Sequence, residues 1–336
     1  MKVSELGEFG LINLLAEMAY STQDNQKTSG QQLIIGIGDD TAAWRNDNSI
    51  QLATIDSLIQ DIHFSFDINS WEELGWKSMA ANISDIAAMG GIPKYALVSL
   101  AMPVHTSVKD ITDFYKGMIN LAKQFSVALI GGDTNSSPII AISITIFGSS
   151  GQNQSILTRS AARPGDKIAV TGKLGGAAAG ERMLRQKLQF NLEASNCLKK
   201  AFLHPSPRVN EGRILAKNGI KSAIDISDGL IQDLGHICKA SQVSAKINID
   251  SIPILPAVKA SFSNIALELA LSGGEDYELL FTGNNQSISR IKKLTPLPIT
   301  IIGEITDDKT GEITLADKNG KPFNLTKTGW DHFTAN

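Results

Sequence analysis

Short apolar segments that end at acidic residues recur along the whole chain, and they constrain the fold more than any other feature of the sequence. Such segments are typical of short buried strands. The acidic residues that follow them, or that follow a pair of glycines, are Asp39, Asp40, Asp56, Asp133, Asp225, Asp228, Glu275 and Asp276. Helical patterns over residues 71–89 and 107–125 alternate with these strands. Because the strands are short and polar at their ends, we expect α+β halves rather than one doubly wound sheet.

A stretch rich in Ser, Gly, Asn, Gln and Pro, residues 148–165, is typical of a boundary between domains. The length of 336 residues also fits two domains. We therefore predict one domain over residues 1–148, beginning with a helix over residues 5–20, and a second over residues 149–336. In the second domain a glycine-rich turn at residues 172–176 opens a helix. It lacks the spacing of a dinucleotide-binding loop, and we interpret it as a strand-to-helix turn.

The charge balance argues against several classes of protein. With 31 Lys and Arg against 34 Asp and Glu, the net charge is −3, which provides no general attraction for nucleic acid or an anionic membrane. The sequence has no apolar run long enough to cross a bilayer and no signal-peptide pattern at its beginning. Two cysteines are too few for a disulfide scaffold. We expect a cytoplasmic protein that binds neither nucleic acid nor membrane.

The acidic residues at the strand ends can converge, because strand ends of an open sheet meet at a common edge. Two carboxylates about 4 Å apart repel by about 4 kcal/mol at an effective dielectric constant of roughly 20, so a cation is expected among them. Carboxylate oxygens are the ligands that Mg²⁺ and Ca²⁺ prefer. Taken singly, Asp228 would cap a helix and Asp39-Asp40 would form a turn. Together with Asp85, on a helix rich in apolar residues, the set favours metal and phosphate chemistry.

Other catalytic motifs are missing from the sequence. There is no Walker A loop, no protein-kinase motif, no G-x-S-x-G and no H-E-x-x-H pattern. Arg159 lies beside the predicted domain boundary, where it would either clamp phosphate oxygens or pair with an acidic residue. Trp330, near the end of the chain, would either pack on the protein body or cover a ligand. The hexapeptide at residues 56–61 resembles residues 228–233, a match short enough to arise by chance.

A set of longer motifs carries a more specific signal. They are residues 7–12 (GEFGLI), 37–42 (IGDDTA), 63–64 (HF), 82–90 (NISDIAAMG), 130–134 (IGGDT), 163–166 (RPGD), 225–230 (DISDGL), 272–279 (SGGEDYEL) and 330–333 (WDHF). By these motifs the chain resembles, almost from end to end, the thiamine-monophosphate kinases, a family of the aminoimidazole ribonucleotide synthetase-like superfamily. Several relatives share the acidic N-terminal motifs, whereas their combination with the last three motifs is much more specific to the kinase.

The resemblance implies a two-domain fold. Its N-terminal α+β half would bind ATP and Mg²⁺ and pair with its twin in a homodimer, and its C-terminal α/β half would complete the substrate site. It implies the reaction of ATP with thiamine phosphate to give ADP and thiamine diphosphate. Several Mg²⁺ ions would assist direct phosphoryl transfer, and a monovalent cation is compatible with the family. The acceptor oxygen is already ionised near neutral pH, so no strong general base is required.

The functional residues of the family match individual positions of this chain. The positions that match its metal ligands are Asp40, Thr54, Ile55, Asp56, Asp85, Asp133, Asp225 and Asp228. Those that match its ATP contacts are Tyr115, Gly132, Asp133, Arg159 and Ser227, and those that match its thiamine phosphate contacts are His63, Glu275 and Trp330. The resemblance implies that Asp40, Asp56, Asp85 and Asp133 act in catalysis through bound metal.

Two positions depart from the family pattern. Ile55 replaces a residue with a hydroxyl group, so only its backbone carbonyl could bind a metal. The Gly175-Gly176 turn lacks a polar residue that is frequent in the family. Neither change removes a carboxylate, and we expect activity to survive. The alternatives are another ATP-using enzyme of the superfamily and a non-catalytic sensor of Mg·ATP, because a fold does not fix a reaction.

Overall fold

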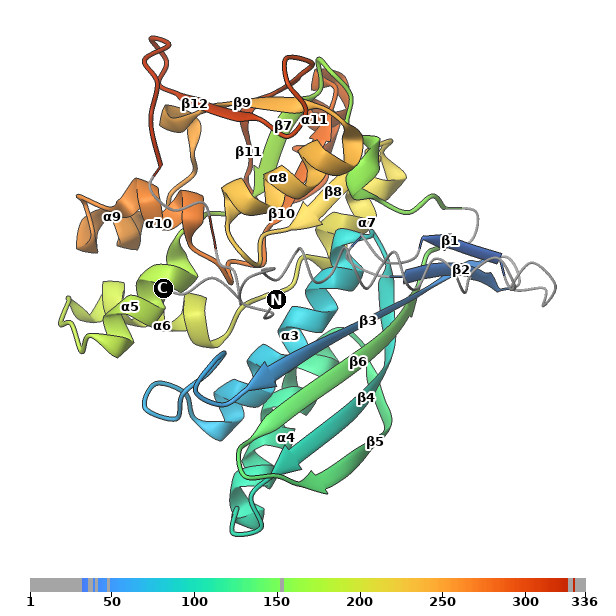
Figure 1. The fold of residues 1–336 in the computed structure, drawn as a ribbon, viewed down its shortest axis with the longest axis vertical. Coiled ribbons are helices and arrows are strands. Elements are labelled where there is room, and N and C mark those ends of the chain that lie inside the picture. Colours follow the sequence, from blue (N-terminus) through green and yellow to red (C-terminus); the bar gives the residue numbers. More distant parts are fainter. Residues whose placement is uncertain are drawn as a thin grey trace, which may run out of the picture.

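The computed structural model describes residues 32–35, 39, 42–46, 49–151, 154–325 and 329. The predicted helix over residues 5–20 lies outside this part of the chain, as do Asp40 and Trp330. The described residues form two six-stranded sheets, one in each half of the chain, with helices beside both (Figure 1). Neither sheet is a doubly wound parallel sheet, in agreement with the expected fold class.

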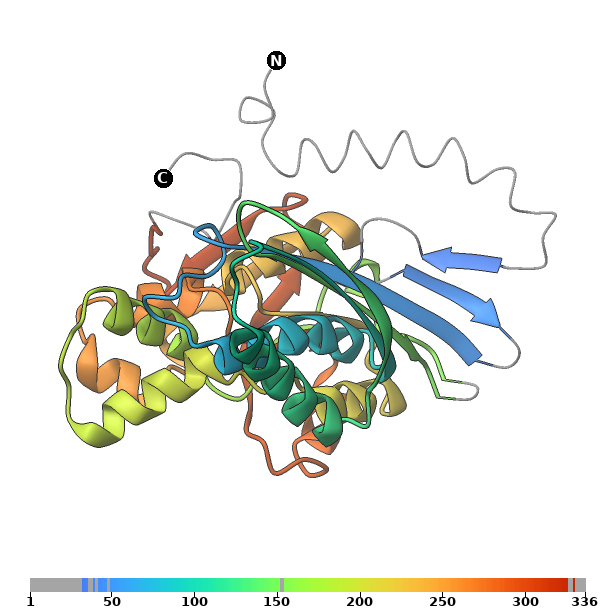
Figure 2. The same ribbon diagram turned by 90° about the horizontal axis from the view of Figure 1, so that it is seen from below.

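The N-terminal sheet has the strand order β1-β2-β3-β6-β4-β5. Its strands pair antiparallel except for β4 and β5, which are parallel and are connected through helix α4. Helices α3 and α4 pack against one face of the sheet (Figure 2). The elements are β1 (Gln32–Ile35), β2 (Ala42–Asn46), β3 (Ser49–Ile59), α3 (Trp71–Ala88), β4 (Ile92–Met102), α4 (Val108–Gln124), β5 (Ala128–Ser136) and β6 (Ala141–Ser149).

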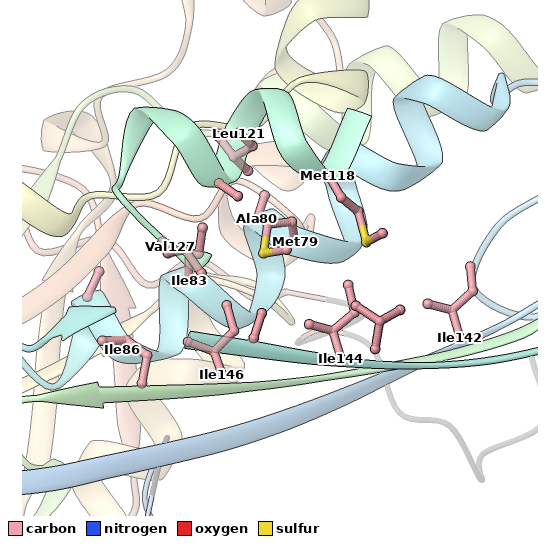
Figure 3. Close-up of a cluster of buried hydrophobic side chains, with 14 of the residues drawn as sticks. Met79, Ala80, Ile83, Ile86, Met118, Leu121, Val127, Ile142, Ile144 and Ile146 are labelled. Atoms are coloured by element: carbon pink, nitrogen blue, oxygen red, sulfur yellow. The ribbon is translucent and has the colours of Figure 1, made fainter. Parts of the chain in front are cut away.

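The core of this half lies between the two helices and the sheet. Figure 3 shows its packing, with labelled side chains from α3 (Met79, Ala80, Ile83, Ile86), α4 (Met118, Leu121), β6 (Ile142, Ile144, Ile146) and the segment before β5 (Val127). Because side chains of a strand alternate between its two faces, Thr54 is buried on the helix-covered face, whereas Ile55 is 62% exposed on the other. Asp56 therefore shares the helix-covered face with Thr54.

Helices α3 and α4 approach each other closely at two glycines. A Cβ atom on Gly75 would lie 1.9 Å from a backbone oxygen of α4, and one on Gly117 would lie 1.8 Å from a backbone oxygen of α3. Any larger residue at either position would push the two helices apart. This contact fixes the position of α3 relative to α4, which matters because α3 carries acidic and basic residues of the site described below.

The C-terminal sheet has the strand order β12-β9-β11-β7-β10-β8, antiparallel except for the pair β9 and β12. Buried apolar side chains of α8 and α10 pack beside this sheet. The strands are β7 (Lys167–Thr171), β8 (Ser222–Asp225), β9 (Ser244–Asn248), β10 (Leu279–Gly283), β11 (Ile299–Thr306) and β12 (Ile313–Ala316). The helices are η2 (Arg159–Ala161), α5 (Gly176–Arg185), α6 (Leu192–Leu203), α7 (Val209–Lys217), α8 (Leu230–Ser241), η3 (Ile249–Ser251), α9 (Pro256–Ser261), α10 (Ala266–Ser272) and α11 (Asn285–Ile291).

Helix α3 also joins the two halves. It packs against α7 and β8 of the C-terminal half, and a Cβ atom on Gly212 of α7 would lie 2.0 Å from the backbone oxygen of Ala87. The indole Nε1 of Trp76 donates a hydrogen bond to the backbone oxygen of Pro205 at 2.8 Å. One long helix is therefore buried between a sheet of its own half and elements of the other. Among the helices described, none has the length and apolarity needed to cross a membrane.

Candidate active site

A cavity of about 570 Å³ lies at the junction of the two halves. Strand β3 and helix α3 line it from the N-terminal half, and helix α5 with the segments 225–228 and 274–277 lines it from the C-terminal half. The predicted site residues that it brings together are Asp56, His63, Asp85, Asp225, Ser227, Asp228 and Glu275. Residues more than 200 positions apart in the sequence thus share one cavity.

Hydroxyl groups orient two of the carboxylates in this cavity. The Oγ1 of Thr54 donates a hydrogen bond to Oδ2 of Asp85 at 2.5 Å. The Oγ of Ser84 donates to Oδ2 of Asp225 at 2.6 Å, across the junction between the halves. Asp225 is only 2% exposed. Because Ser84 and Asp85 are neighbours on α3, this helix helps to position carboxylates from both halves.

The turn between β8 and α8 is shaped by Asp233, a residue that sequence reasoning did not single out for function. Its Oδ2 accepts hydrogen bonds from the backbone nitrogens of Ser227, Asp228 and Gly229 at 3.1, 3.2 and 3.1 Å. Burial, with the nearby charges of Asp228 and Asp225, raises the pKa of the Asp233 carboxyl well above its usual value. Asp233 therefore fixes the backbone that presents Ser227 and Asp228 to the cavity.

The resemblance between residues 56–61 and residues 228–233 could have drawn attention to Asp233, but the two hexapeptides differ in structure. Residues 56–61 lie on β3 and the turn after it, whereas residues 228–233 open helix α8. The two similar hexapeptides are therefore not a structural repeat. A carboxylate five positions after Asp228 reaches back to the start of its own helix, where backbone N–H groups lack partners within the helix.

The segment after α10 presents Glu275 in a constrained backbone conformation. Glu275 and Tyr277 have φ values of 65° and 48°, in the left-handed region that residues with a side chain rarely adopt. Hydrogen bonds from the backbone nitrogen of Glu275 to Ser227 O at 2.8 Å and from that of Tyr277 to Ile226 O at 2.9 Å hold the segment to the β8–α8 turn. The two C-terminal segments that line the cavity therefore form one unit.

Asp276 occupies the N-terminus of helix α5. Its carboxylate accepts hydrogen bonds from the backbone nitrogens of Gly175 at 2.6 Å and Ala177 at 3.1 Å. Gly175 has a φ of 82°, so a residue with a side chain would be strained there. The turn at residues 172–176 thus has its donors taken by a side chain, which confirms its interpretation as a strand-to-helix turn.

The raised pKa of the buried Asp276 carboxyl is expected to make the stability of the protein depend on pH. Burial raises the pKa of its carboxyl to about 7 although the backbone N–H groups oppose the shift. Between pH 4 and pH 7 the unfolded chain loses this proton while the folded protein keeps it, so the contribution to stability decreases as pH rises, by up to about 4 kcal/mol. We expect the free energy of unfolding of Asp276→Asn, measured by denaturant titration, to fall less over this range than that of the wild type. Parallel pH profiles of the two proteins would contradict the expectation.

His63 lies on the cavity wall with its ring orientation fixed. The backbone nitrogen of Ile59 donates a hydrogen bond to Nδ1 of His63 at 3.0 Å. A neutral ring that accepts at Nδ1 carries its proton on Nε2. His63 can therefore donate a hydrogen bond from Nε2 to an anionic ligand.

Arg159, in η2 beside helix α8, is held by Asp39. Its backbone nitrogen donates to Oδ2 of Asp39 at 3.0 Å, and its Nε lies 3.7 Å from Oδ1 of the same carboxylate. Its charge acts on Asp233 and His236 as well. Burial, followed by the charges of Arg159 and Lys239, lowers the pKa of His236 to about 4, so this imidazole is neutral near pH 7. Of the two predicted alternatives for Arg159, the pairing with an acidic residue is present, and it does not exclude a contact with phosphate.

Three predicted residues lie away from this cavity. Tyr115 lines a second cavity of about 650 Å³, together with residues 134–136 of β5. Gly132 and Asp133 precede those residues on the same strand and are exposed. The Nδ2 of Asn135 donates to Oδ2 of Asp133 at 2.5 Å. Since β6 and β4 separate β5 from β3, one chain does not bring Asp133 beside Asp56.

The donors in the cavity between the halves suit a hard cation. Four aspartates line it, Asp56, Asp85, Asp225 and Asp228, and together they offer carboxylate oxygens from both halves. Such oxygens are the preferred ligands of Mg²⁺. Ile55 directs its side chain to the opposite face of the sheet, so only its backbone carbonyl could join the aspartates at the ion. Cavity size, charge and the fixed turns together suit the binding of phosphate groups through metal ions.

Two such sheets with an acidic cavity at their junction place the chain in the class of the AIR synthase related proteins. The family described as AIR synthase related protein, N-terminal domain, matches residues 38–150, and the family described as AIR synthase related protein, C-terminal domain, matches residues 163–316. A structure of the hydrogenase maturation protein HypE in complex with ATP has a TM-score of 0.69 at 17% identity, which shows the shared fold alone.

Comparison with individual proteins is more specific. The thiamine-monophosphate kinase of Bacillus subtilis (strain 168) is 37% identical, covering 89% of this chain and 93% of its own. That of Escherichia coli (strain K12) is 38% identical, covering 92% and 95%. The solved structure of AaThiL complexed with AMPPCP and TMP has a TM-score of 0.83 at 30% identity and covers 99% of both chains. The chain belongs to the thiamine-monophosphate kinase family.

Proposed function

We propose that this chain transfers the terminal phosphoryl group of ATP to thiamine phosphate, which yields thiamine diphosphate and ADP. The observation that carries the proposal is the cavity between the halves, where four aspartates adjoin His63 and Glu275. Phosphoryl transfer depends on positioning and on charge neutralisation more than on covalent catalysis. The relatives' names support the acceptor, and the structure of AaThiL with AMPPCP and TMP supports a site for two phosphate-bearing ligands.

The aspartates provide the electrostatic part of this mechanism. Asp56, Asp85, Asp225 and Asp228 would hold Mg²⁺. Bound there, Mg²⁺ would neutralise charge on the phosphates of donor and acceptor, which otherwise repel each other. The hydrogen bonds from Thr54 and Ser84 keep two of these carboxylates in fixed orientations. Asp40 and Asp133 remain proposed ligands on the strength of the sequence.

The remaining residues would orient the two substrates. Ser227 presents its side chain from the turn fixed by Asp233, and the charge of Arg159 acts on the same Asp233, so both suit the ATP phosphates. His63 would donate from Nε2 to the acceptor phosphate, and Glu275 would contact the organic part of thiamine phosphate. Tyr115 and Gly132 are proposed ATP contacts, and Trp330 a proposed cover of the acceptor, from the sequence motifs.

The proposal is tested by incubating the purified protein with ATP, Mg²⁺ and thiamine phosphate and separating the thiamine species by chromatography. Free thiamine is run as a parallel acceptor. We expect thiamine diphosphate to form from thiamine phosphate only, and to require Mg²⁺. Binding of Mg·ATP without product from either acceptor would instead favour a sensor or another reaction of the superfamily.

We also propose that two copies pair through the N-terminal domain, over residues 1–148, while residues 149–336 complete the substrate site. Helices α3 and α4 cover one face of the N-terminal sheet, and the exposed apolar residues Ile55, Tyr95 and Ile130 belong to strands of that sheet. Exposed apolar residues on several strands of one sheet are typical of an interface. Light scattering after size-exclusion chromatography should give a dimer, and Ile130→Asp should shift it toward monomer. A monomeric wild type would contradict the pairing.

A further inference from the structure

Lys77 is a buried cation at the junction of the two halves. Its side chain on α3 is 5% exposed, and its Nζ lies 2.9 Å from Oε2 of Glu275 and 3.6 Å from the centre of the Phe202 ring. Both contacts come from the C-terminal half, whereas Lys77 belongs to the N-terminal half. A lysine is rarely buried unless its charge is paired, so this position is held by those two contacts.

Glu275 depends on this lysine for its orientation. Its backbone is held by the hydrogen bond to Ser227 O at 2.8 Å, and its side chain is 32% exposed on the cavity wall. Within the described residues, Lys77 is the one side chain that hydrogen-bonds the Glu275 carboxylate, and it engages Oε2. This leaves Oε1 as the acceptor oxygen for a ligand in the cavity.

The pairing also changes what Glu275 can recognise. An ion pair of Lys77 and Glu275 has no net charge, so it attracts a cationic ring only weakly. The carboxylate remains a strong hydrogen-bond acceptor, because a charged oxygen bonds an N–H donor more strongly than a neutral one does. Thiamine carries both features, a cationic thiazolium ring and a neutral pyrimidine ring with an amino group.

We propose that Lys77 is a positioning residue for the acceptor: it holds Glu275 so that Oε1 accepts a hydrogen bond from the pyrimidine amino group of thiamine phosphate, and Glu275 does not serve as counter-ion of the thiazolium. This inference rests on the proposed function and deepens it. Because Lys77 and Glu275 come from different halves, recognition of the amino group also requires that the two halves are correctly joined.

The test uses two acceptors, thiamine phosphate and oxythiamine phosphate, which keeps the thiazolium charge and the phosphate but carries oxygen in place of the amino group. We expect wild-type kcat/KM to favour thiamine phosphate by about 10- to 100-fold, the effect of one hydrogen bond to a charged group. Lys77→Met should reduce this preference to a few-fold and raise KM for thiamine phosphate, with KM for ATP nearly unchanged. Lys77→Arg, which keeps a charged donor, should restore most of the preference.

Two further variants separate positioning from a general effect on structure. Trp76→Phe removes the neighbouring hydrogen bond to Pro205 across the same junction without touching Glu275, and it should keep the wild-type preference. The double variant with Lys77→Met and Glu275→Gln should have a kcat/KM for thiamine phosphate no lower than that of the more impaired single variant, because both substitutions remove the same interaction. If Lys77→Met does not fold, Lys77→Gln, which retains a polar chain, takes its place.

The outcomes are distinguishable. A Lys77→Met protein that keeps the preference for thiamine phosphate, or that loses affinity for ATP equally, overturns the proposal, as does full additivity in the double variant. A wild type that makes no thiamine diphosphate overturns the proposed function first. In that case the role of Lys77 is decided by calorimetry, with each acceptor titrated into the wild type and into Lys77→Met. The proposal is supported if Lys77→Met binds thiamine phosphate more weakly than the wild type does but binds oxythiamine phosphate equally well. It is overturned if the two proteins bind thiamine phosphate equally.

Discussion

Substituting Asp85 by Asn is expected to lower kcat by about 10³-fold or more while the protein remains folded. Asp85 lines the cavity beside three other aspartates, and its Oδ2 accepts the hydrogen bond of Thr54. An asparagine of the same size can still accept that bond, so packing is preserved, but the negative charge needed to bind Mg²⁺ is lost. Loss of one electrostatic contact to a reacting group commonly costs 10²- to 10³-fold, and loss of a bound ion costs more.

The measurement is steady-state turnover over a range of Mg²⁺ concentrations, with circular dichroism to verify folding. Asp113→Asn is the matched control, since it makes the same chemical change on helix α4, which does not line this cavity and where Asp113 pairs with Lys109 and Lys116. This control should retain wild-type kcat. Near-normal turnover of Asp85→Asn at saturating Mg²⁺ would show that Asp85 does not serve the metal.

Arg208→Met is expected to cost about 3–5 kcal/mol of stability, the usual loss when one member of a buried ion pair is removed. The Nε and Nη2 of Arg208 bond both oxygens of Glu278, at 2.8 and 2.5 Å. Burial opposes the charge of Arg208, but attraction to Glu278 and their hydrogen bonds raise its pKa overall. Glu278 is 3% exposed and also accepts a hydrogen bond from Thr171, so without Arg208 its charge would stay buried and uncompensated.

Denaturant unfolding of single and double variants tests this network. Combining Arg208→Met with Glu278→Gln removes both charges, so the double variant should be more stable than Arg208→Met alone. As a control, Lys246→Met breaks an exposed pair with Asp308, 58% and 56% exposed, and should change stability by no more than about 1 kcal/mol. An Arg208→Met protein as stable as this control would mean that the Glu278 charge is neutralised in another way.

Local features of the fold could be read from the sequence because they depend on neighbouring residues. The predicted helices over residues 71–89 and 107–125 are α3 (Trp71–Ala88) and α4 (Val108–Gln124), and the Ser107 side chain caps α4 by accepting a hydrogen bond from the backbone nitrogen of Asp110. Strand ends were read less well: β8 ends at Asp225 as expected, but β3 continues past Asp56 to Ile59 and β5 continues past Asp133 to Ser136. The family, too, was identifiable from contiguous motifs, and the comparisons confirm it.

The order of the strands could not be read in this way. Asp56 and Asp133 both follow apolar segments, and convergence was a reasonable expectation for both. Two strands separate β3 from β5, however, so Asp133 with Tyr115 and Gly132 lies at another part of the surface. Strand order follows from pairing between segments far apart in the chain, which no periodicity within one segment reports.

What the sequence by itself determined is the set of acidic residues, the elements that carry them and the family of the chain. Only the tertiary structure decided which charges are buried and which partners they have. Lys77 and Glu278 look like ordinary surface residues in the sequence, yet one pairs with Glu275 across the junction and the other with Arg208. The physical reason is that burial is a property of packed elements, and a charge can stay in such a place only beside a partner that the fold brings to it.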